Sequence, residues 1–296
     1  MRNNNAKSEA WIGPTVAKVF TPGFIRTILD DDSVQTLHNL SKSVVFLRDA
    51  IESNDLSEFF ELAYGFMSSN YRNEYVFQNS IYNQLYPTQQ HIDSCDWLAE
   101  IRSGESIADI VVISNSEPHA FEVKSAVDNQ KKAILQVEQY QKVFPIVSIV
   151  STNNKIRTLA ESVPAAVGLY FLSEDLQLEV HRKPETYTKK LDPRTMFKTL
   201  RRHEYLELSK KLFGELPDVT PAALYESCLD LALSAPIARF VDVYFEVLRS
   251  RSTYNRAFHW PSNTPSVAYL VNVLVTRKKD RVKLLSMLDQ TKGWAT

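Results

Sequence analysis

Apolar residues recur every three or four positions over the first part of the chain. This spacing predicts one helix over residues 33–53, a second from Asp55 and a third over residues 71–85. The preceding residues are polar at first and then hold Pro14, Pro22 and Gly23, so we expect a loose arm there. The chain therefore opens with a helical region.

Short apolar runs separated by turn residues follow. They predict strands over residues 97–101, 110–113, 120–123, 146–150, 168–172 and 176–180. Between the third and fourth strands, an apolar stripe with Ala133, Val137 and Tyr140 predicts a helix over residues 129–144, ended by Pro145. We expect a mixed α/β core in which the last two strands form a hairpin that extends the sheet.

Helical periodicity returns after a basic linker that includes His181 to Pro184. It predicts helices over residues 196–213, 221–233, 237–251 and 267–288. We therefore divide the chain into an N-terminal arm with helices (1–68), an α/β core (69–184) and a helical C-terminal domain (185–296).

Composition excludes several classes of protein. The 296 residues are 44% hydrophobic and 23% charged, which is ordinary for a globular protein, and the net charge of −1 creates no global basic field. Two cysteines are too few for a disulfide framework or a zinc cluster. No apolar run reaches membrane-spanning length, and the first residues lack the apolar core of a signal peptide. We expect a cytoplasmic protein that does not bind membranes.

Three charged residues interrupt the hairpin over residues 109–124. Asp109 opens its first strand, and Glu122 and Lys124 flank Val123 on its second strand, where alternation sends both side chains to one face. Two carboxylates on neighbouring strands can hold a hard cation, and a lysine beside them can position a water. The alternative is a hairpin with a cross-strand ion pair.

An acidic residue followed across a hairpin by Glu-x-Lys resembles the signature of the PD-(D/E)XK nuclease superfamily. The resemblance spans roughly residues 70–180 and implies a restriction-endonuclease-like αβββαβ core. It further implies that Asp109, Glu122 and the carbonyl of Val123 bind Mg²⁺ or Mn²⁺, while Lys124 activates the attacking water. The stretch YRNEYVFQN and the later LRRHEYL also look like a little-characterised bacterial branch, which suggests nucleases of defence or mobile-element context.

The resemblance also points to supporting residues. Many relatives carry an acidic residue on the helix before the sheet, and Glu74 matches that place; it also shares a helical stripe with Phe77 and Ile81. The alternative is a first-turn glutamate stabilised by the helix dipole or paired with Arg72. A Gln or Tyr on the helix after Glu-x-Lys matches Gln139 and Tyr140, for which the alternatives are a solvent-facing Gln and a core Tyr.

One further residue near the hairpin is a weaker candidate. Glu100 is a candidate because it lies on a strand expected to neighbour Asp109; the alternative is an outward-facing strand residue. We expect His91 and His119, which lie near turns and share no ligand spacing, to be exposed.

Nucleic acid is the expected partner, with DNA favoured over RNA. Basic clusters include Arg201 with Arg202, Arg249 with Arg251, and Lys278 with Lys279, and such clusters can grip phosphates, although most charge runs are solvated faces. Two other functions stay open: a non-catalytic nucleic-acid-binding or interaction module, and an RNA-directed nuclease. A homodimer is also open, because cleavage of both strands would favour one.

Overall fold

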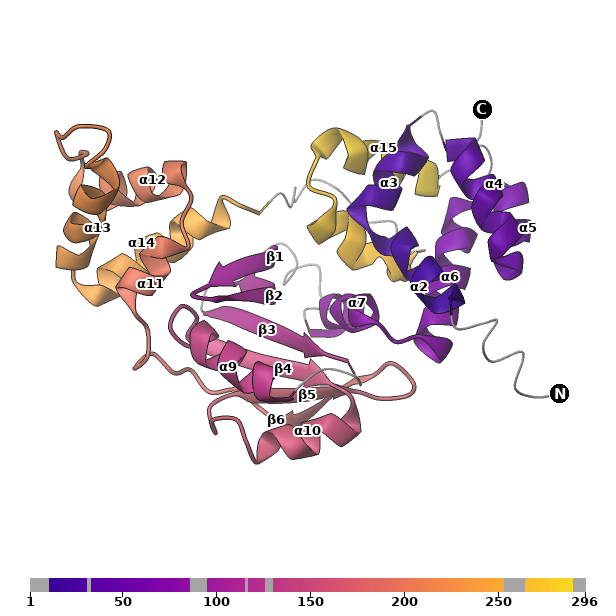
Figure 1. Ribbon diagram of the computed structural model, residues 1–296, viewed down its shortest axis with the longest axis horizontal. Helices are drawn as coiled ribbons and strands as arrows, with labels where there is room; N and C mark the ends of the chain where they lie inside the picture. Colours follow the sequence, from indigo (N-terminus) through magenta and orange to yellow (C-terminus); the bar gives the residue numbers. More distant parts are fainter. Residues whose placement is uncertain are drawn as a thin grey trace. The chain divides into compact units, whose positions relative to one another are not determined.

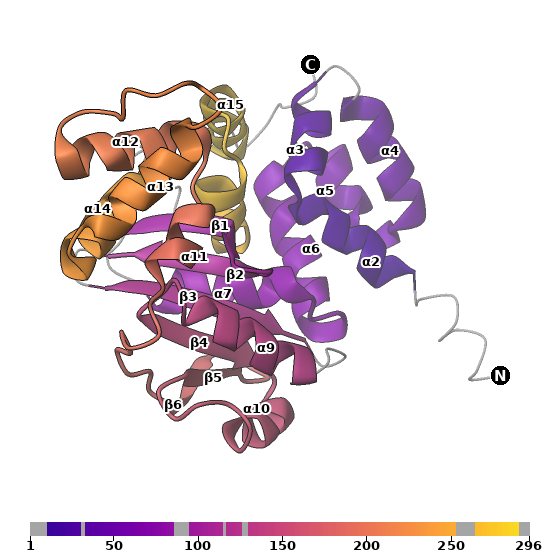
Figure 2. The same cartoon turned by 60° about the vertical axis from the view of Figure 1, so that its left-hand side comes forward.

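A computed structural model describes residues 11–30, 33–85, 95–114, 117–125, 130–252 and 264–289. The chain forms two compact units, drawn in Figures 1 and 2. The first unit comprises Met1–Gln89, Leu172–Leu178 and Thr253–Thr296, and the second comprises Gln90–Phe171 and Glu179–Ser252. These units combine segments far apart in the sequence, so they do not follow the three consecutive parts proposed above.

The first unit is built mainly from helices. They are α2 (Ile12–Ala17), η1 (Lys18–Phe20), α3 (Pro22–Leu29), α4 (Ser33–Ser43), η2 (Val45–Leu47), α5 (Arg48–Glu52), α6 (Leu56–Asn70), α7 (Glu74–Leu85), η3 (Pro265–Val267), the π-helix η4 (Leu270–Leu274) and α15 (Lys278–Asp289). Aromatic rings fill its centre: Phe20 stacks on Tyr75 with ring centroids 4.5 Å apart and also contacts Phe60. The described residues from the start and the end of the chain thus share one unit.

Two of the long predicted helices are broken in this unit. The helix expected over residues 33–53 is interrupted at Val44, whose backbone (φ −123°, ψ 86°) is not helical. The helix expected over residues 267–288 is interrupted between Leu274 and Lys278. By contrast, α6 begins after Asp55 as predicted, and the Asp55 carboxylate caps it by accepting from the Glu58 N–H at 2.8 Å.

A six-stranded mixed sheet forms the centre of the second unit, which confirms the mixed α/β prediction. Its strands run in chain order: β1 (Asp96–Ser103), β2 (Ser106–Ile113), β3 (Pro118–Lys124), β4 (Ile146–Ser151), β5 (Gly168–Leu172) and β6 (Leu178–Arg182). The pairs β1–β2 and β2–β3 are antiparallel, whereas β3–β4 and β4–β5 are parallel. The parallel pairs need crossovers, which α9 (Gln130–Tyr140) and α10 (Asn153–Ala160) provide; α10 was not predicted.

The helices α11 (Pro193–Lys198), α12 (Arg202–Phe213), α13 (Leu224–Ser234) and α14 (Ile237–Arg249) complete this unit. One apolar core runs from the sheet through α9 to these helices, and it includes Val137, Phe144, Phe197 and Tyr244. The helix expected over residues 196–213 is split, because the chain turns at Thr199 to Arg201 before α12 begins. No helix in the described part of the chain is long and apolar enough to cross a membrane.

Candidate functional site

The two predicted carboxylates lie at equivalent positions of β2 and β3, where the ladder between these strands ends. Its last pair is Ile110 with Phe121, so one further step would pair Asp109 with Glu122. Instead, the Asp109 Oδ2 atom accepts the backbone N–H of Val123 at 2.6 Å. A side chain thus replaces a main-chain acceptor, and the register places Asp109 beside Glu122 on the neighbouring strand.

Glu122 and Lys124 form a buried ion pair on one face of β3. Lys124 Nζ donates to Glu122 Oε1, and the two side chains are 8% and 1% exposed, respectively. Both follow Ala120 at two-residue spacing, and Ala120 belongs to the apolar core. The predicted common face is therefore confirmed, and the charges are held in the interior. Such burial is costly unless each charged group is paired and hydrogen-bonded.

Tyr140 completes the cluster from the last turn of α9. Its hydroxyl donates toward Glu122 Oε2 and also lies 2.6 Å from the carbonyl oxygen of Ile107. A phenol has one proton, so it satisfies one of these acceptors at a time. When Tyr140 donates to the Ile107 carbonyl, a protonated Glu122 can donate to the Tyr140 hydroxyl oxygen. The hydrogen bond between Glu122 and Tyr140 is then kept with its direction reversed. Burial raises the pKa of Glu122, and Lys124 and Tyr140 only partly oppose that rise.

Gln136 is the supporting residue that the sequence analysis missed. Its Nε2 atom donates to the Tyr140 hydroxyl at 3.3 Å, and its Oε1 atom is buried and makes no hydrogen bond to any residue that the structure describes. Gln136 precedes Tyr140 by one helical turn, so the i, i+4 spacing was the available signal. Gln139, the predicted residue, instead accepts from Lys142 at 3.2 Å, and its Oε1 atom would lie only 2.3 Å from a Cβ added at Gly104.

The donor set fits a hard cation with few protein ligands. Within the described ranges, no group of three or more His, Cys, Asp or Glu side chains is placed to hold a metal ion. Mg²⁺ commonly takes only one or two carboxylates from a protein and keeps water and phosphate oxygens for the rest of its shell. Asp109 and Glu122 would supply those two carboxylates, while the unpaired Gln136 oxygen could accept a hydrogen bond from a bound water.

Glu74 lies in the first unit, on the first turn of α7, and its side chain is exposed. The expectation that it extends the buried face of this helix is therefore wrong, although Phe77 and Ile81 are buried as expected. Gln78 donates to the Glu74 carboxylate one turn away. Exposure at the N-terminus of a helix suits a carboxylate because the helix dipole and water both stabilise it.

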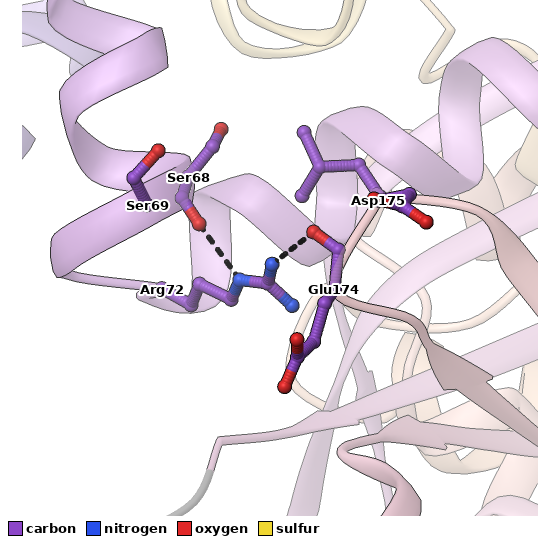
Figure 3. Close-up of a pocket in the computed structure, with 6 residues that line it drawn as sticks. Ser68, Ser69, Arg72, Glu174 and Asp175 are labelled. Carbon is purple, nitrogen blue, oxygen red and sulfur yellow. Dashed lines mark hydrogen bonds between the residues drawn. The ribbon is translucent and has the colours of Figure 1, made fainter.

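Arg72, the alternative partner of Glu74, lines a cavity of about 710 Å³ in the first unit (Figure 3). The guanidinium donates to the carbonyl oxygens of Ser68 and Ser173, each at 2.7 Å, and to that of Glu174. Arg72 thus ties the turn around Ser173 to the end of α6. These bonds to main-chain carbonyls give Arg72 a structural role.

Glu100 is exposed and stands opposite Asp109 at the one position where the β1–β2 register is interrupted. Its φ of 54° lies in the left-handed region, which is uncommon for a residue other than glycine. Leu98 and Ile101 both belong to the apolar core despite their odd spacing. Strand alternation therefore shifts at Glu100, next to the carboxylate pair.

His119 is buried, contrary to the prediction, whereas His91 lies outside the described residues. The His119 Nε2 atom lies 2.8 Å from Ser148 Oγ on β4, and the imidazole packs on Phe121. Burial lowers the pKa of His119 from 6.5 to about 3. The histidine is therefore a neutral core residue, and its burial depends on a strand that lies far away in the sequence.

The basic clusters differ in whether their side chains are exposed or are bound to other groups of the protein. Arg201 and Arg202 at the start of α12, and Lys278 with Lys279 at the start of α15, are exposed as nucleic-acid contacts require. Arg249 donates to the carbonyl of Ser114 at 2.5 Å. Arg251 forms an ion pair with the fully buried Glu204 at 2.6 Å, which makes it structural.

Comparison with family models finds a match to a family described as bacteriophage P4 protein cII, over residues 67–264. The matched segment includes every residue of the carboxylate cluster. Neither the curated proteins nor the solved structures include a match to this chain.

Proposed function

We propose that this chain, which belongs to the bacteriophage P4 protein cII family, is a metal-dependent nuclease that hydrolyses phosphodiester bonds. The observation that carries the proposal is the cluster of the half-buried Asp109 with the buried Glu122, Lys124 and Tyr140, where the β2–β3 ladder ends. A purely structural role would not require charged groups here, because an apolar cluster of similar volume can be equally stable. Clusters of buried, mutually perturbed ionisable groups are concentrated at functional sites.

Each residue has a distinct role in this proposal. Asp109 and Glu122 would hold Mg²⁺ or Mn²⁺, with the carbonyl of Val123 as a further ligand implied by the PD-(D/E)XK resemblance. When bound, the cation would supply Lewis-acid stabilisation of charge on the phosphate. Lys124 Nζ lies beside the Glu122 carboxylate, where it can orient a water and neutralise developing negative charge. The order α7, β1, β2, β3, α9, β4 supports a restriction-endonuclease-like αβββαβ core.

Tyr140 and Gln136 act as positioning residues. Tyr140 links the Glu122 carboxylate to the main chain at Ile107, which limits the rotation of that carboxylate. Gln136 supports the Tyr140 hydroxyl from one turn earlier on α9. Both residues therefore hold Glu122 in the orientation that an incoming cation would meet.

DNA is the favoured substrate. RNA is the alternative, because the same site residues would serve either nucleic acid. The family is named after a bacteriophage protein, which favours a mobile-element context in the bacterial cytoplasm. Arg201 and Arg202 in the same unit as the site are proposed phosphate contacts, as are Lys278 and Lys279 in the other unit.

A non-catalytic binding module is the second candidate function. It is favoured by the two oxygens of Glu122, which already have partners in Lys124 and Tyr140 and so do not require a cation. Titration with Mn²⁺ separates the two functions. A nuclease binds the ion in a manner that depends on Asp109, whereas a binding module has no need to hold it.

The nuclease proposal is tested by incubating the purified chain with plasmid, linear and single-stranded DNA and with RNA. Parallel reactions contain Mg²⁺, Mn²⁺ or a chelator. We expect cutting that requires a divalent ion. Its absence under every condition, in a folded protein that binds no Mn²⁺, would favour the binding module.

A further inference from the structure

The strand β6 forms one edge of the six-stranded sheet, and β1 forms the other (Figure 1). An edge strand presents main-chain N–H and C=O groups that can pair with a further strand. On β1 this edge is interrupted at Glu100, which has a positive φ and is skipped in the register with β2. No residue of β6 has a positive φ, and Val180 in its middle is 50% exposed. The β6 edge is therefore the better suited to pairing.

The turn of the β5–β6 hairpin shows which main-chain groups point to the open side. The Ser173 N–H donates to the Gln177 carbonyl oxygen at 2.9 Å, so these residues form a hydrogen-bonded pair. Such pairs recur every two residues in an antiparallel ladder, and the residues between them direct their main-chain groups away from the partner strand. Val180 and Arg182 are such intervening residues, so their N–H and C=O groups point to the outer edge.

The first outward position of β6 is already bound. The Leu178 N–H donates to Gln84 Oε1 at 2.8 Å, and both residues belong to the first unit. Farther along the strand, the main chain of Val180 and Arg182 has no hydrogen bond to the described residues outside β5. The open part of the edge is therefore short and begins after Leu178.

Pro184 marks the other end of the open edge, because proline has no N–H. The chain then turns inward across the sheet. The Glu185 N–H donates to the carbonyl oxygen of Ala166 at 2.9 Å, and the Tyr187 N–H donates to that of Pro145 at 2.8 Å. Ala166 and Pro145 lie just before β5 and β4, so the segment after β6 does not cover its outer edge.

Charges along this edge have a self-complementary order. Glu179, His181 and Lys183 follow one another at two-residue spacing, and all three are exposed. In an antiparallel pair of two β6 strands centred on His181, Glu179 of each copy stands opposite Lys183 of the other. Centring the pair on Arg182 would instead place Glu179 opposite Glu185, where like charges repel. The charge order thus favours a second copy of the chain in one register.

We propose that two copies of this chain pair antiparallel through β6, about a two-fold axis at His181. Val180 of each copy exchanges both main-chain hydrogen bonds with Arg182 of the other. Leu178 stands opposite Pro184 of the second copy, and this position needs no bond, because the Leu178 N–H is already bound and proline has none. Such a dimer would carry two carboxylate clusters, which suits cleavage of both strands of a duplex. The pairing goes beyond the proposed function and does not rest on it.

Sedimentation equilibrium of the full chain over a range of concentrations tests the pairing. Val180→Pro removes an outward N–H and keeps the ladder with β5, because that N–H does not bond to β5. The matched control is Val180→Thr, which retains the N–H and a β-branched side chain. We expect a wild-type dimer whose dissociation constant rises about tenfold or more in Val180→Pro and is little changed in the control. Thermal unfolding verifies that each variant is folded.

Charge reversal tests the register without changing the main chain. In Glu179→Lys, two lysines face each other across the interface, so we expect the dissociation constant of the dimer to rise roughly three- to tenfold. Adding Lys183→Glu makes the facing charges opposite again and should restore the dimer. Glu215→Lys, which changes an exposed glutamate of the same unit, should leave the dissociation constant unchanged.

His181→Cys reports the position of the two-fold axis directly. Facing residues of a non-hydrogen-bonded antiparallel pair have Cα atoms about 4.5 Å apart, which is within the range that a disulfide spans. We expect oxidised His181→Cys to migrate as a covalent dimer on a non-reducing gel, whereas Glu179→Cys, which is displaced from the axis, stays monomeric there. The native Cys95 and Cys228 are buried and should not compete.

A wild type that stays monomeric at every concentration would overturn this inference, as would a dimer that folded Val180→Pro leaves unchanged. If Val180→Pro does not fold, the charge-reversal pair decides: a dimer that Glu179→Lys does not weaken refutes the pairing. A covalent dimer of Glu179→Cys without one of His181→Cys would contradict the register. None of these measurements depends on cleavage, so they stand or fall separately from the nuclease.

Discussion

Asp109 Oδ2 lies 2.6 Å from the main-chain nitrogen of Val123. This carboxylate therefore both accepts a hydrogen bond from β3 and faces the proposed cation site. The two roles can be separated by substitution. Asp109→Asn keeps an acceptor oxygen for the Val123 N–H but removes the charge that holds a cation. Asp109→Leu removes both.

We expect Asp109→Asn to abolish cleavage and Mn²⁺ binding while changing the free energy of unfolding by less than about 1 kcal/mol. Asp109→Leu should lose about 1–3 kcal/mol more, because the N–H of Val123 is then unsatisfied. Denaturant unfolding and Mn²⁺ titration measure the two effects. Full activity in Asp109→Asn would show that this residue holds no cation.

Tyr140→Phe removes the hydroxyl that joins Glu122 to Ile107. We expect it to destabilise the fold by about 1–3 kcal/mol and to raise the metal concentration that gives half-maximal cleavage by about 10–100-fold. A control is Tyr170→Phe on β5. If Tyr140→Phe changes only the stability, and not the metal dependence, then Tyr140 does not position Glu122.

His119 predicts an acid-sensitive fold. Its pKa is about 3 in the folded chain, against an ordinary value of 6.5, so between these values the unfolded chain binds a proton that the folded chain does not. Stability is therefore lost as the pH falls below 6.5, by up to about 1.4 kcal/mol per pH unit. His119→Gln should show a smaller loss from about pH 7 to about pH 5 when unfolding is followed by denaturant titration. An equal slope in both proteins would contradict this assignment.

The ion pair of Glu204 and Arg251 predicts that substitutions of these two residues have strongly coupled effects on the free energy of unfolding. Arg251 donates to both Glu204 oxygens and to the carbonyl of Thr199 at 2.8 Å. Removing one partner should cost about 3–5 kcal/mol, because a buried charge is left unpaired, whereas Glu204→Leu with Arg251→Met should cost much less. A double-mutant cycle from thermal or denaturant unfolding measures the coupling. Additive losses would show that the pair is not coupled.

The sequence was sufficient to predict the hairpin and the common face of two of its charged residues, because strand alternation is local. Spacing by two residues placed Glu122 and Lys124 on one face, and the turn between the apolar runs implied the β2–β3 pairing. The breaks at Val44 and at Thr199 to Arg201 were not evident, since the apolar periodicity continues across them. Periodicity detects faces, but it does not locate where a helix stops.

The supporting residues depended on tertiary contacts that no local pattern carries. Gln136 and Gln139 both lie beside the apolar stripe of α9, and only the contact of Gln136 with the Tyr140 hydroxyl distinguishes them. The burial of His119 depends on Ser148 of β4, and the exposure of Glu74 depends on how α7 packs within its unit. These contacts and exposures follow from how helices and strands pack together.

Cleavage by a lysine variant is the most direct measurement of the proposed chemistry. Lys124→Met keeps much of the side-chain volume but removes the ammonium beside Glu122, and Lys198→Ala removes an exposed lysine of the same unit as a matched control. Thermal unfolding confirms that both variants are folded. With Mg²⁺ or Mn²⁺, we expect the wild type and the control to cut nucleic acid and folded Lys124→Met to be inactive. Cutting by Lys124→Met at the wild-type rate would contradict the account.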